Sequence, residues 1–296
     1  MASHALPRTG RRRFITVGFR VGTYLALLLI IGPVLWLLIG IIGRAVPHFS
    51  WSVLTHPTAG ESGGLENAII GTLLLMAGVL ILAGGIGILA GLHLAEFAKP
   101  RRSGKESGGL LRIASDVLSG FPSIVLGYVG YAALVLGLHW DFSLLAAWII
   151  LSIMVIPYIA KSTETALRQV PTAYREGAEA LGMPSGYALR TVTLKTALPG
   201  IVTGLLIALA IAGGETAPLI YTAGAFADSP VSVSLTHHPV PYLTFLVYGF
   251  YTLPENAAHY LAYDAALVLV VLVLVLLVSA RLIVNRTQRY AEGRRN

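Results

Sequence analysis

Six apolar segments, each long enough to cross a lipid bilayer as a helix, follow one another along this chain. Hydrophobic residues make up 55% of its 296 residues, a share that is high for a soluble domain. Polar stretches stay below about 40 residues, so a soluble catalytic domain of ordinary size has no room. We therefore predict an all-α polytopic membrane protein with six transmembrane helices, at 17–42, 67–97, 110–137, 143–160, 197–223 and 260–284.

The apolar segments and the loops between them predict three regions. Residues 1–66 are expected to form a cytoplasmic N-terminus, a retained signal anchor and an extracytoplasmic loop. Residues 67–284 are expected to form a core of five transmembrane helices with a cytoplasmic loop at 161–196. Residues 285–296 would form a cytoplasmic tail. Within the core, Gly120-Phe121-Pro122-Ser123 interrupts the third helix and predicts a kink, because proline and glycine free backbone groups there.

Basic residues gather on one side of the predicted membrane, although the chain as a whole carries a net charge of +7. They occur in the N-terminal segment, in the loop after the second helix, in the polar stretch and in the tail. The loops on the other side hold only Arg44. Since cytoplasmic loops carry an excess of Lys and Arg, both termini and the polar stretch are expected to face the cytoplasm. The charge therefore indicates membrane topology and not a nucleic-acid partner.

The polar stretch contains one short helix, predicted over 173–181. Thr172 is expected to be its N-cap, Gly182 supplies a left-handed residue after its end, and Pro184 prevents continuation. Small residues on one side would let another protein approach the backbone, while a solvated connecting helix is the alternative. The two sides carry different residues: Ala173, Gly177, Ala180 and Leu181 on one, and Arg175, Glu176 and Glu179 on the other.

An acid, Glu215, falls well inside the fifth predicted helix, between Gly214 and Thr216. An ionisable residue at membrane depth is costly and therefore indicates a functional role. A glutamate that holds a helix–helix contact is the structural alternative. The remaining acids at this depth lie near helix ends and are equally able to reach the interface: Glu96, Asp116 and Asp264.

The sequence contains no motif for covalent chemistry in the structural context that such a motif requires. Residues 60–64 match the G-x-S-x-G pattern but lie in a loop too short for the strand and helix of a nucleophile elbow. Gly104-Lys105 is followed by Glu106, so no phosphate-binding nucleotide loop is present. Cysteine is absent, and the histidines form no H-E-x-x-H pair. We expect no catalytic residue, no metal site and no bound cofactor in this chain.

Glu176-Gly177-Ala178, followed by three residues and Gly182, resembles the E-A-A signature of binding-protein-dependent ABC importer permeases. Two departures stand out, because Gly177 replaces the middle alanine and Lys195 replaces a later proline. Thr193-Leu194-Lys195, with 214–219, is similar to the second permease subunit of phosphate importers. The resemblance extends over roughly residues 60 to 285 and includes three further segments: Gly63-Gly64-Leu65-x-Asn67-Ala68, Leu94-Ala95-Glu96-Phe97 and Pro122-Ser123-Ile124-Val125-x-Gly127.

The resemblance implies the type I ABC importer permease fold, in a bacterial cytoplasmic membrane. It implies three kinds of partner besides lipid: a second permease subunit in a heterodimer, two cytoplasmic ATPases that use ATP and magnesium, and an extracytoplasmic phosphate-binding protein. The helix at 173–181 would dock on an ATPase through Arg175, Glu176, Gly177, Ala178, Glu179 and Gly182. The translocation path or gate would include Glu215, Thr216, Ser123 and Pro122.

The substrate path leaves alternatives open. Relatives often carry arginine one turn before the glutamate, where this chain has Ile211. A cation for phosphate would then come from the partner permease, and Glu215 would pair with it or act in a gate, because a bare carboxylate repels an anion. A permease for another solute, such as another oxyanion or an amino acid, is the nearest alternative. A stand-alone secondary transporter or channel is a more distant one.

Overall fold

A computed structural model describes residues 9–60, 62–98 and 109–292, which fall into two compact units, Met1–Phe49 and Ser50–Asn296. The first unit contains α1 (Thr9–Ala45), and its stretch Ile15–Ala45 is apolar and long enough to cross a membrane. This helix agrees with the predicted first span. The basic residues expected within 1–8, 99–108 and 293–296 lie outside the described residues.

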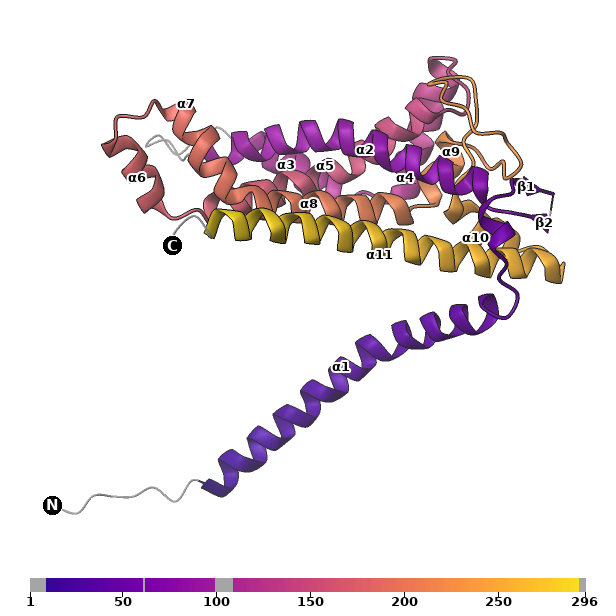
Figure 1. Ribbon diagram of the computed structural model, residues 1–296, viewed down its shortest axis with the longest axis horizontal. Helices are drawn as coiled ribbons and strands as arrows, with labels where there is room; N and C mark the ends of the chain where they lie inside the picture. The colour runs from indigo at the N-terminus through magenta and orange to yellow at the C-terminus, as the bar shows by residue number, and fades with distance from the viewer. Residues whose placement is uncertain (1–8, 61, 99–108, 293–296) are drawn as a thin grey trace. The chain divides into compact units, whose positions relative to one another are not determined.

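The second unit is a helical bundle with one small hairpin. Figure 1 shows the short helices α6 and α7 at one end of this bundle, with β1, β2 and α10 at the other. The elements in chain order are η1 (Trp51–Leu54), β1 (Thr58–Ala59), β2 (Ser62–Gly63), α2 (Glu66–Leu92), η2 (His93–Phe97), α3 (Gly109–Ser119), α4 (Ser123–Gly130), η3 (Tyr131–Gly137), α5 (Leu144–Arg168), α6 (Thr172–Ala180), α7 (Ser185–Ala188), η4 (Leu189–Thr193), α8 (Leu194–Gly214), α9 (Ala217–Thr222), α10 (Leu243–Tyr251) and α11 (Asn256–Glu292).

Five helices of the described chain are long and apolar enough to span a membrane. Gly109–Ser119 and Ser123–Gly137 would make a sixth span if counted together, but they are bent by 100°. The all-α polytopic class is confirmed. The predicted kink at 120–123 is present, as a bend of 100° between the two helical segments. Pro122 has an extended backbone (ψ 128°), so helix geometry restarts only after it.

The fifth predicted helix differs from the structure at both ends. It starts earlier, because Ser185–Gly214 is one continuous helical stretch that includes much of the polar region. It also ends earlier, at Gly214, where Glu215 is extended (ψ 137°) and the short helix α9 follows. The expected run to residue 223 is therefore wrong. Pro218 explains this, because a proline ring inside a continuous helix would clash with the carbonyl of Gly214.

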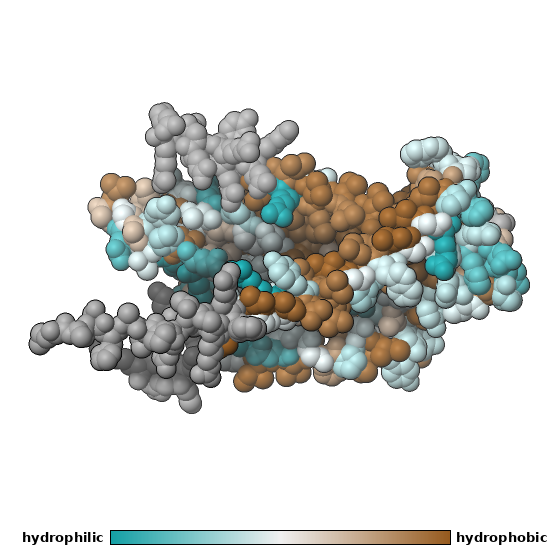
Figure 2. All heavy atoms as spheres, turned by 90° about the horizontal axis from the view of Figure 1, so that it is seen from below, coloured by the Kyte–Doolittle hydropathy of each residue, from teal (hydrophilic) through white to brown (hydrophobic). Residues whose placement is uncertain are grey.

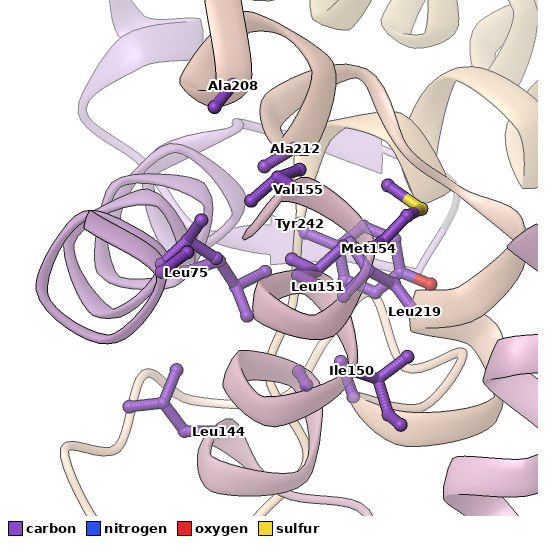
Figure 3. Close-up of a cluster of buried hydrophobic side chains, with 14 of the residues drawn as sticks. Leu75, Leu144, Ile150, Leu151, Met154, Val155, Ala208, Ala212, Leu219 and Tyr242 are labelled. Carbon is purple, nitrogen blue, oxygen red and sulfur yellow. The ribbon is translucent and has the colours of Figure 1, made fainter. Parts of the chain in front are cut away.

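The core of the second unit is centred on α5, which contacts both α2 and α8. Figure 3 shows buried side chains from these three helices, with Leu219 and Tyr242, meeting in one cluster. Glycines of α2 allow the close approach, since an added Cβ at Gly87 would meet Ile159 at 2.7 Å, and one at Gly91 the Ala160 carbonyl at 2.5 Å. Apolar residues occupy much of the surface seen in Figure 2, as contact with lipid requires.

The resemblance segment Gly63-Gly64-Leu65-x-Asn67-Ala68 closes the hairpin end of the bundle. The Asn67 side chain is buried, accepts hydrogen bonds from the backbone and hydroxyl of Thr58, and donates to the carbonyls of Ala227 and Ser229. Gly64 lies so close to the His56 carbonyl that a Cβ there would overlap it. One amide side chain thereby joins the hairpin, α2 and the long loop before α10, an apolar helix that falls within the predicted loop 224–259.

Candidate functional site

Helix α6 is the predicted short helix of the polar stretch, displaced by one residue. Thr172 is its first residue and Pro171 its N-cap, so the expected capping role of Thr172 is wrong. Its end is as predicted, because Gly182 has a left-handed backbone (φ 71°). The amide of Gly182 donates to the Glu179 carbonyl at 2.9 Å, and that of Met183 to the Ala178 carbonyl at 3.1 Å. These two bonds define a Schellman motif, which fixes where the helix stops.

The exposed and the buried residues of α6 do not divide into the two sides that the sequence pattern predicted. Glu176, Gly177 and Glu179 are exposed, and Leu181 just after the helix is 76% exposed. Two of the predicted ATPase-coupling residues turn inward instead. Ala178 is 4% exposed, and the Arg175 side chain contacts its own chain. The surface open to another protein therefore combines small, apolar and acidic residues: Ala173, Glu176, Gly177, Glu179, Ala180, Leu181 and Gly182.

Arg175 holds α6 against the end of α2. Its Nη1 donates to Glu96 Oε2 at 2.7 Å, and its Nη2 donates to Glu96 Oε1 at 2.6 Å and to the Leu167 carbonyl at 3.3 Å. The two side chains are 29% and 14% exposed, so the pair is largely shielded from water. A bidentate guanidinium–carboxylate pair is both strong and directional. The predicted helix is thus fixed to η2, which ends α2, and to α5.

A second charged group lies at the same end of the bundle. Glu164 of α5 is 5% exposed, and its Oε1 accepts from Arg112 of α3 at 3.1 Å and from Arg168 at 2.9 Å. Arg168 also donates to the Leu94 carbonyl at 3.3 Å. These contacts join α3, α5 and η2, and sequence reasoning missed them because their partners lie 52 and 74 residues apart.

Glu215 lies at a break between helices, where its side chain meets α4. The Ser123 hydroxyl, at the first position of α4, lies beside the Glu215 carboxylate. The Glu215 carbonyl accepts from the Thr244 hydroxyl at 2.7 Å. Two of the four predicted path residues therefore meet directly, and Thr244 is a third participant that no motif indicated. We call Ser123, Glu215 and Thr244 the polar junction.

The other two predicted path residues lie beside this junction. Pro122 is the exposed N-cap of α4, and Thr216 is the half-buried N-cap of α9. Helices α4 and α9 touch closely, because a Cβ on Gly127 would stand 2.6 Å from the Pro218 Cα. Ile211, one turn before Glu215, is half-buried at the end of α8. The junction is thus built where three helix ends meet.

Comparison with known proteins assigns this chain to a family. The family model for the binding-protein-dependent transport system inner membrane component matches residues 83–289. The chain belongs to this family. The matched region of the permease includes α6, the Glu96–Arg175 pair and the whole polar junction, and it leaves α1 outside.

Individual relatives agree with this membership. The chain is 54% identical over 273 residues to the phosphate transport system permease protein PstA 2 of Mycobacterium bovis, covering 92% of this chain and 89% of that protein. It is 34% identical over 255 residues to a probable PstA of Methanocaldococcus jannaschii, covering 86% and 88% of the two chains. To the PstA of Yersinia pestis it is 32% identical over 252 residues, covering 84% and 83%.

Solved structures share the fold of this permease. A structure of a bacterial ABC transporter involved in the import of alginate matches with a TM-score of 0.60 and 15% identity, covering 93% of this chain and 96% of that one. An inward-facing structure of the MetNI methionine ABC transporter matches with a TM-score of 0.56 and 23% identity, covering 75% and 97%. The type I importer permease fold expected from the sequence is confirmed.

Proposed function

We propose that this permease is a membrane-spanning subunit of an ATP-driven phosphate importer. The observation that carries the proposal is the identity of 54% with a phosphate transport permease over nearly the whole length of both proteins. In this function the chain forms the translocation path with a second permease subunit. It receives phosphate from an extracytoplasmic binding protein.

The exposed surface of α6 supports a coupling role. Glycine and alanine on this surface let a partner approach the backbone, and Leu181 offers an apolar side chain that its own chain leaves uncovered. A helix that inserts into a groove is a common recognition mode. In this proposal the groove belongs to a cytoplasmic ATPase, which binds and hydrolyses ATP with magnesium. Glu176 and Glu179 would meet basic residues of that groove.

The polar junction supports a role in the path. Phosphate is strongly hydrated, so it needs polar groups that replace water during passage. Ser123 and Thr216 are both half-buried and supply hydroxyls at the N-terminal ends of α4 and α9. Glu215 would repel the anion unless a cationic side chain faces it. This chain has the uncharged Ile211 one turn before Glu215 and so supplies no cation at that position. The proposal therefore places that cation on the second permease, and makes Glu215 its partner or part of a gate.

The orientation proposed for the chain follows its charges. The end of the bundle with α6 carries the Lys and Arg excess of the polar stretch, so this end faces the cytoplasm together with both termini. The hairpin and the loop before α10 then face outward, in a bacterial cytoplasmic membrane.

Uptake of labelled phosphate tests the substrate. A strain that lacks this gene should lose high-affinity uptake and regain it with the wild-type gene. Uptake of methionine and of sulfate should stay constant, which separates phosphate from the other solutes considered. Unchanged phosphate uptake would reject the substrate. Transport by the purified chain alone in liposomes, without any ATPase, would reject the importer itself.

A further inference from the structure

Helix α3 is too short to cross a bilayer and does not continue into a helix that could. It has 11 residues, and at about 1.5 Å per residue it is roughly half as long as the hydrocarbon layer is thick. It turns by 100° before Ser123–Gly137. Helix α3 and Ser123–Gly137 both contact α5, a membrane-spanning helix, and the 100° bend means that they cannot both run along it.

The two sides of α3 differ sharply. On one side Arg112 reaches the buried Glu164 of α5, which fixes how the helix is rotated. On the other side Leu110, Ile113 and Val117 are 82%, 62% and 53% exposed. Their spacing of three and four residues puts them in one apolar stripe. The ion pair therefore holds Arg112 against the protein and leaves the apolar stripe uncovered.

The level of α3 in the membrane follows from the same ion pair. Glu164 lies one turn before the end of α5, next to the polar stretch that carries α6. Charged side chains of a spanning helix are placed near its end, where water and lipid head groups meet. A helix anchored at that level, and too short to cross the bilayer, lies in the interface.

We propose that α3 is an in-plane anchor whose apolar stripe inserts into the lipid leaflet on the α6 side of the membrane. The positive charge of the neighbouring sequence favours lipid as the partner of this stripe. Lys99, Arg101, Arg102 and Lys105 precede α3 in the chain, and clustered basic residues beside an amphipathic helix attract anionic lipid head groups. The in-plane position is independent of the substrate. Naming this leaflet the cytoplasmic one rests on the orientation proposed above.

Single cysteines carrying an environment-sensitive fluorophore test the anchor, because the natural chain has no cysteine. Ile113→Cys and Val117→Cys probe the apolar stripe, and Asp116→Cys, exposed on the polar side, is the matched control. Each variant is studied in the complete importer complex in vesicles that contain phosphatidylglycerol. The fluorophores at 113 and 117 should show blue-shifted emission and loss of quenching by iodide. A nitroxide placed near the lipid head group should quench them more strongly than one near the acyl-chain end.

Three outcomes would overturn the anchor. Strong iodide quenching at 113 and 117 would mean that the stripe faces water. Stronger quenching by the deep nitroxide would mean that α3 crosses the hydrocarbon. Protection from iodide and from both nitroxides would mean that a partner subunit covers the stripe. Iodide is also added to only one side of the vesicles that carry the fluorophore at position 116. The side from which it quenches identifies the leaflet, so an error in the proposed orientation is distinguished from an error in the proposed in-plane position of α3.

Discussion

Arg175 and Glu96 are joined by two parallel hydrogen bonds of 2.7 and 2.6 Å, although they lie 79 residues apart in the chain. The pair connects α6, the exposed helix of the polar stretch, to η2 at the end of α2. A displacement of α6 is therefore transmitted to α2 through side chains, as well as to α5 and α7 through the backbone. The pair lies on the side of α6 that packs against the rest of the chain, and the proposed ATPase contact lies on the exposed side.

Breaking this pair should weaken coupling while leaving the proposed docking surface intact. We expect Glu96→Gln and Arg175→Gln each to lower phosphate uptake relative to the ATP hydrolysed by the purified complex. The exchange Glu96→Arg with Arg175→Glu should recover part of the loss, with a coupling energy between the two sites of about 0.5–3 kcal/mol. Arg190→Gln, on an exposed position of the adjoining helix, is the control. Equal losses in the single and exchanged variants would show that the pair does not transmit motion.

The left-handed backbone at Gly182 makes a separate prediction. A Cβ there would meet nothing within 4 Å, so the cost of Gly182→Val is conformational, at about 1–2 kcal/mol or more for a β-branched residue. We expect this variant to reach the membrane but to lose substrate-stimulated ATPase activity and uptake. Gly182→Asn should retain more activity, because asparagine tolerates this conformation. Gly186→Ala, at an open position of α7, should be unaffected, and normal coupling in Gly182→Val would refute the role.

The polar junction predicts a transport defect without a loss of assembly. Glu215→Gln keeps an acceptor for Ser123 but removes the charge, and we expect uptake to fall by about tenfold, since hydrogen bonds to charged groups contribute about 1.5–3 kcal/mol. Ser123→Ala should cause a smaller loss. Co-purification of the partner subunits monitors assembly in both variants. If Glu215→Gln separates the subunits, the carboxylate holds a helix contact and does not serve the path.

Close packing between α4 and α9 predicts a stability effect at Gly127. Gly127→Ala would place a Cβ against the backbone of Pro218, and overpacking of this kind costs about 1–3 kcal/mol. We expect a lower midpoint of thermal unfolding for the purified complex and weaker uptake. Gly85→Ala provides the matched control, because a Cβ at that glycine of α2 meets nothing within 4 Å. Equal midpoints for the two variants would mean that α4 and α9 separate freely.

Much of this architecture could be predicted from the sequence, because the length of each hydrophobic segment is read residue by residue. The same holds for the end of α6, where Gly182 determines the backbone locally. The break after Gly214 was missed, although Pro218 was a visible signal for it. Apolar composition continued through the break and suggested one long helix. The kink before α4 was predicted without its angle of 100°, since a proline indicates an interruption but not its angle.

The charged contacts could not be predicted, because they depend on how helices are placed against one another. The sequence placed Arg175 on the charged side of α6, which was expected to face solvent. In the structure Arg175 instead pairs with Glu96 on a different helix. Thr244 lay in a predicted loop, and only the presence of α10 brings its hydroxyl to the Glu215 carbonyl. In each case the residue type was visible, and the partner came from tertiary packing.

The unbroken stretch Ser185–Gly214 has a mechanical consequence. Its 30 residues start beside α6 and end at Gly214, directly before Glu215, so about 45 Å of continuous helical structure joins the proposed ATPase contact to the proposed path. Beyond Gly214 the chain is extended, and α9 packs with α4 instead. A rotation imposed at the α7 end would therefore turn Glu215 relative to Ser123 of α4 and Thr244 of α10. Such a rotation would change the contact of the Glu215 carboxylate with Ser123 and that of the Glu215 carbonyl with Thr244, and would thereby open or close the proposed path.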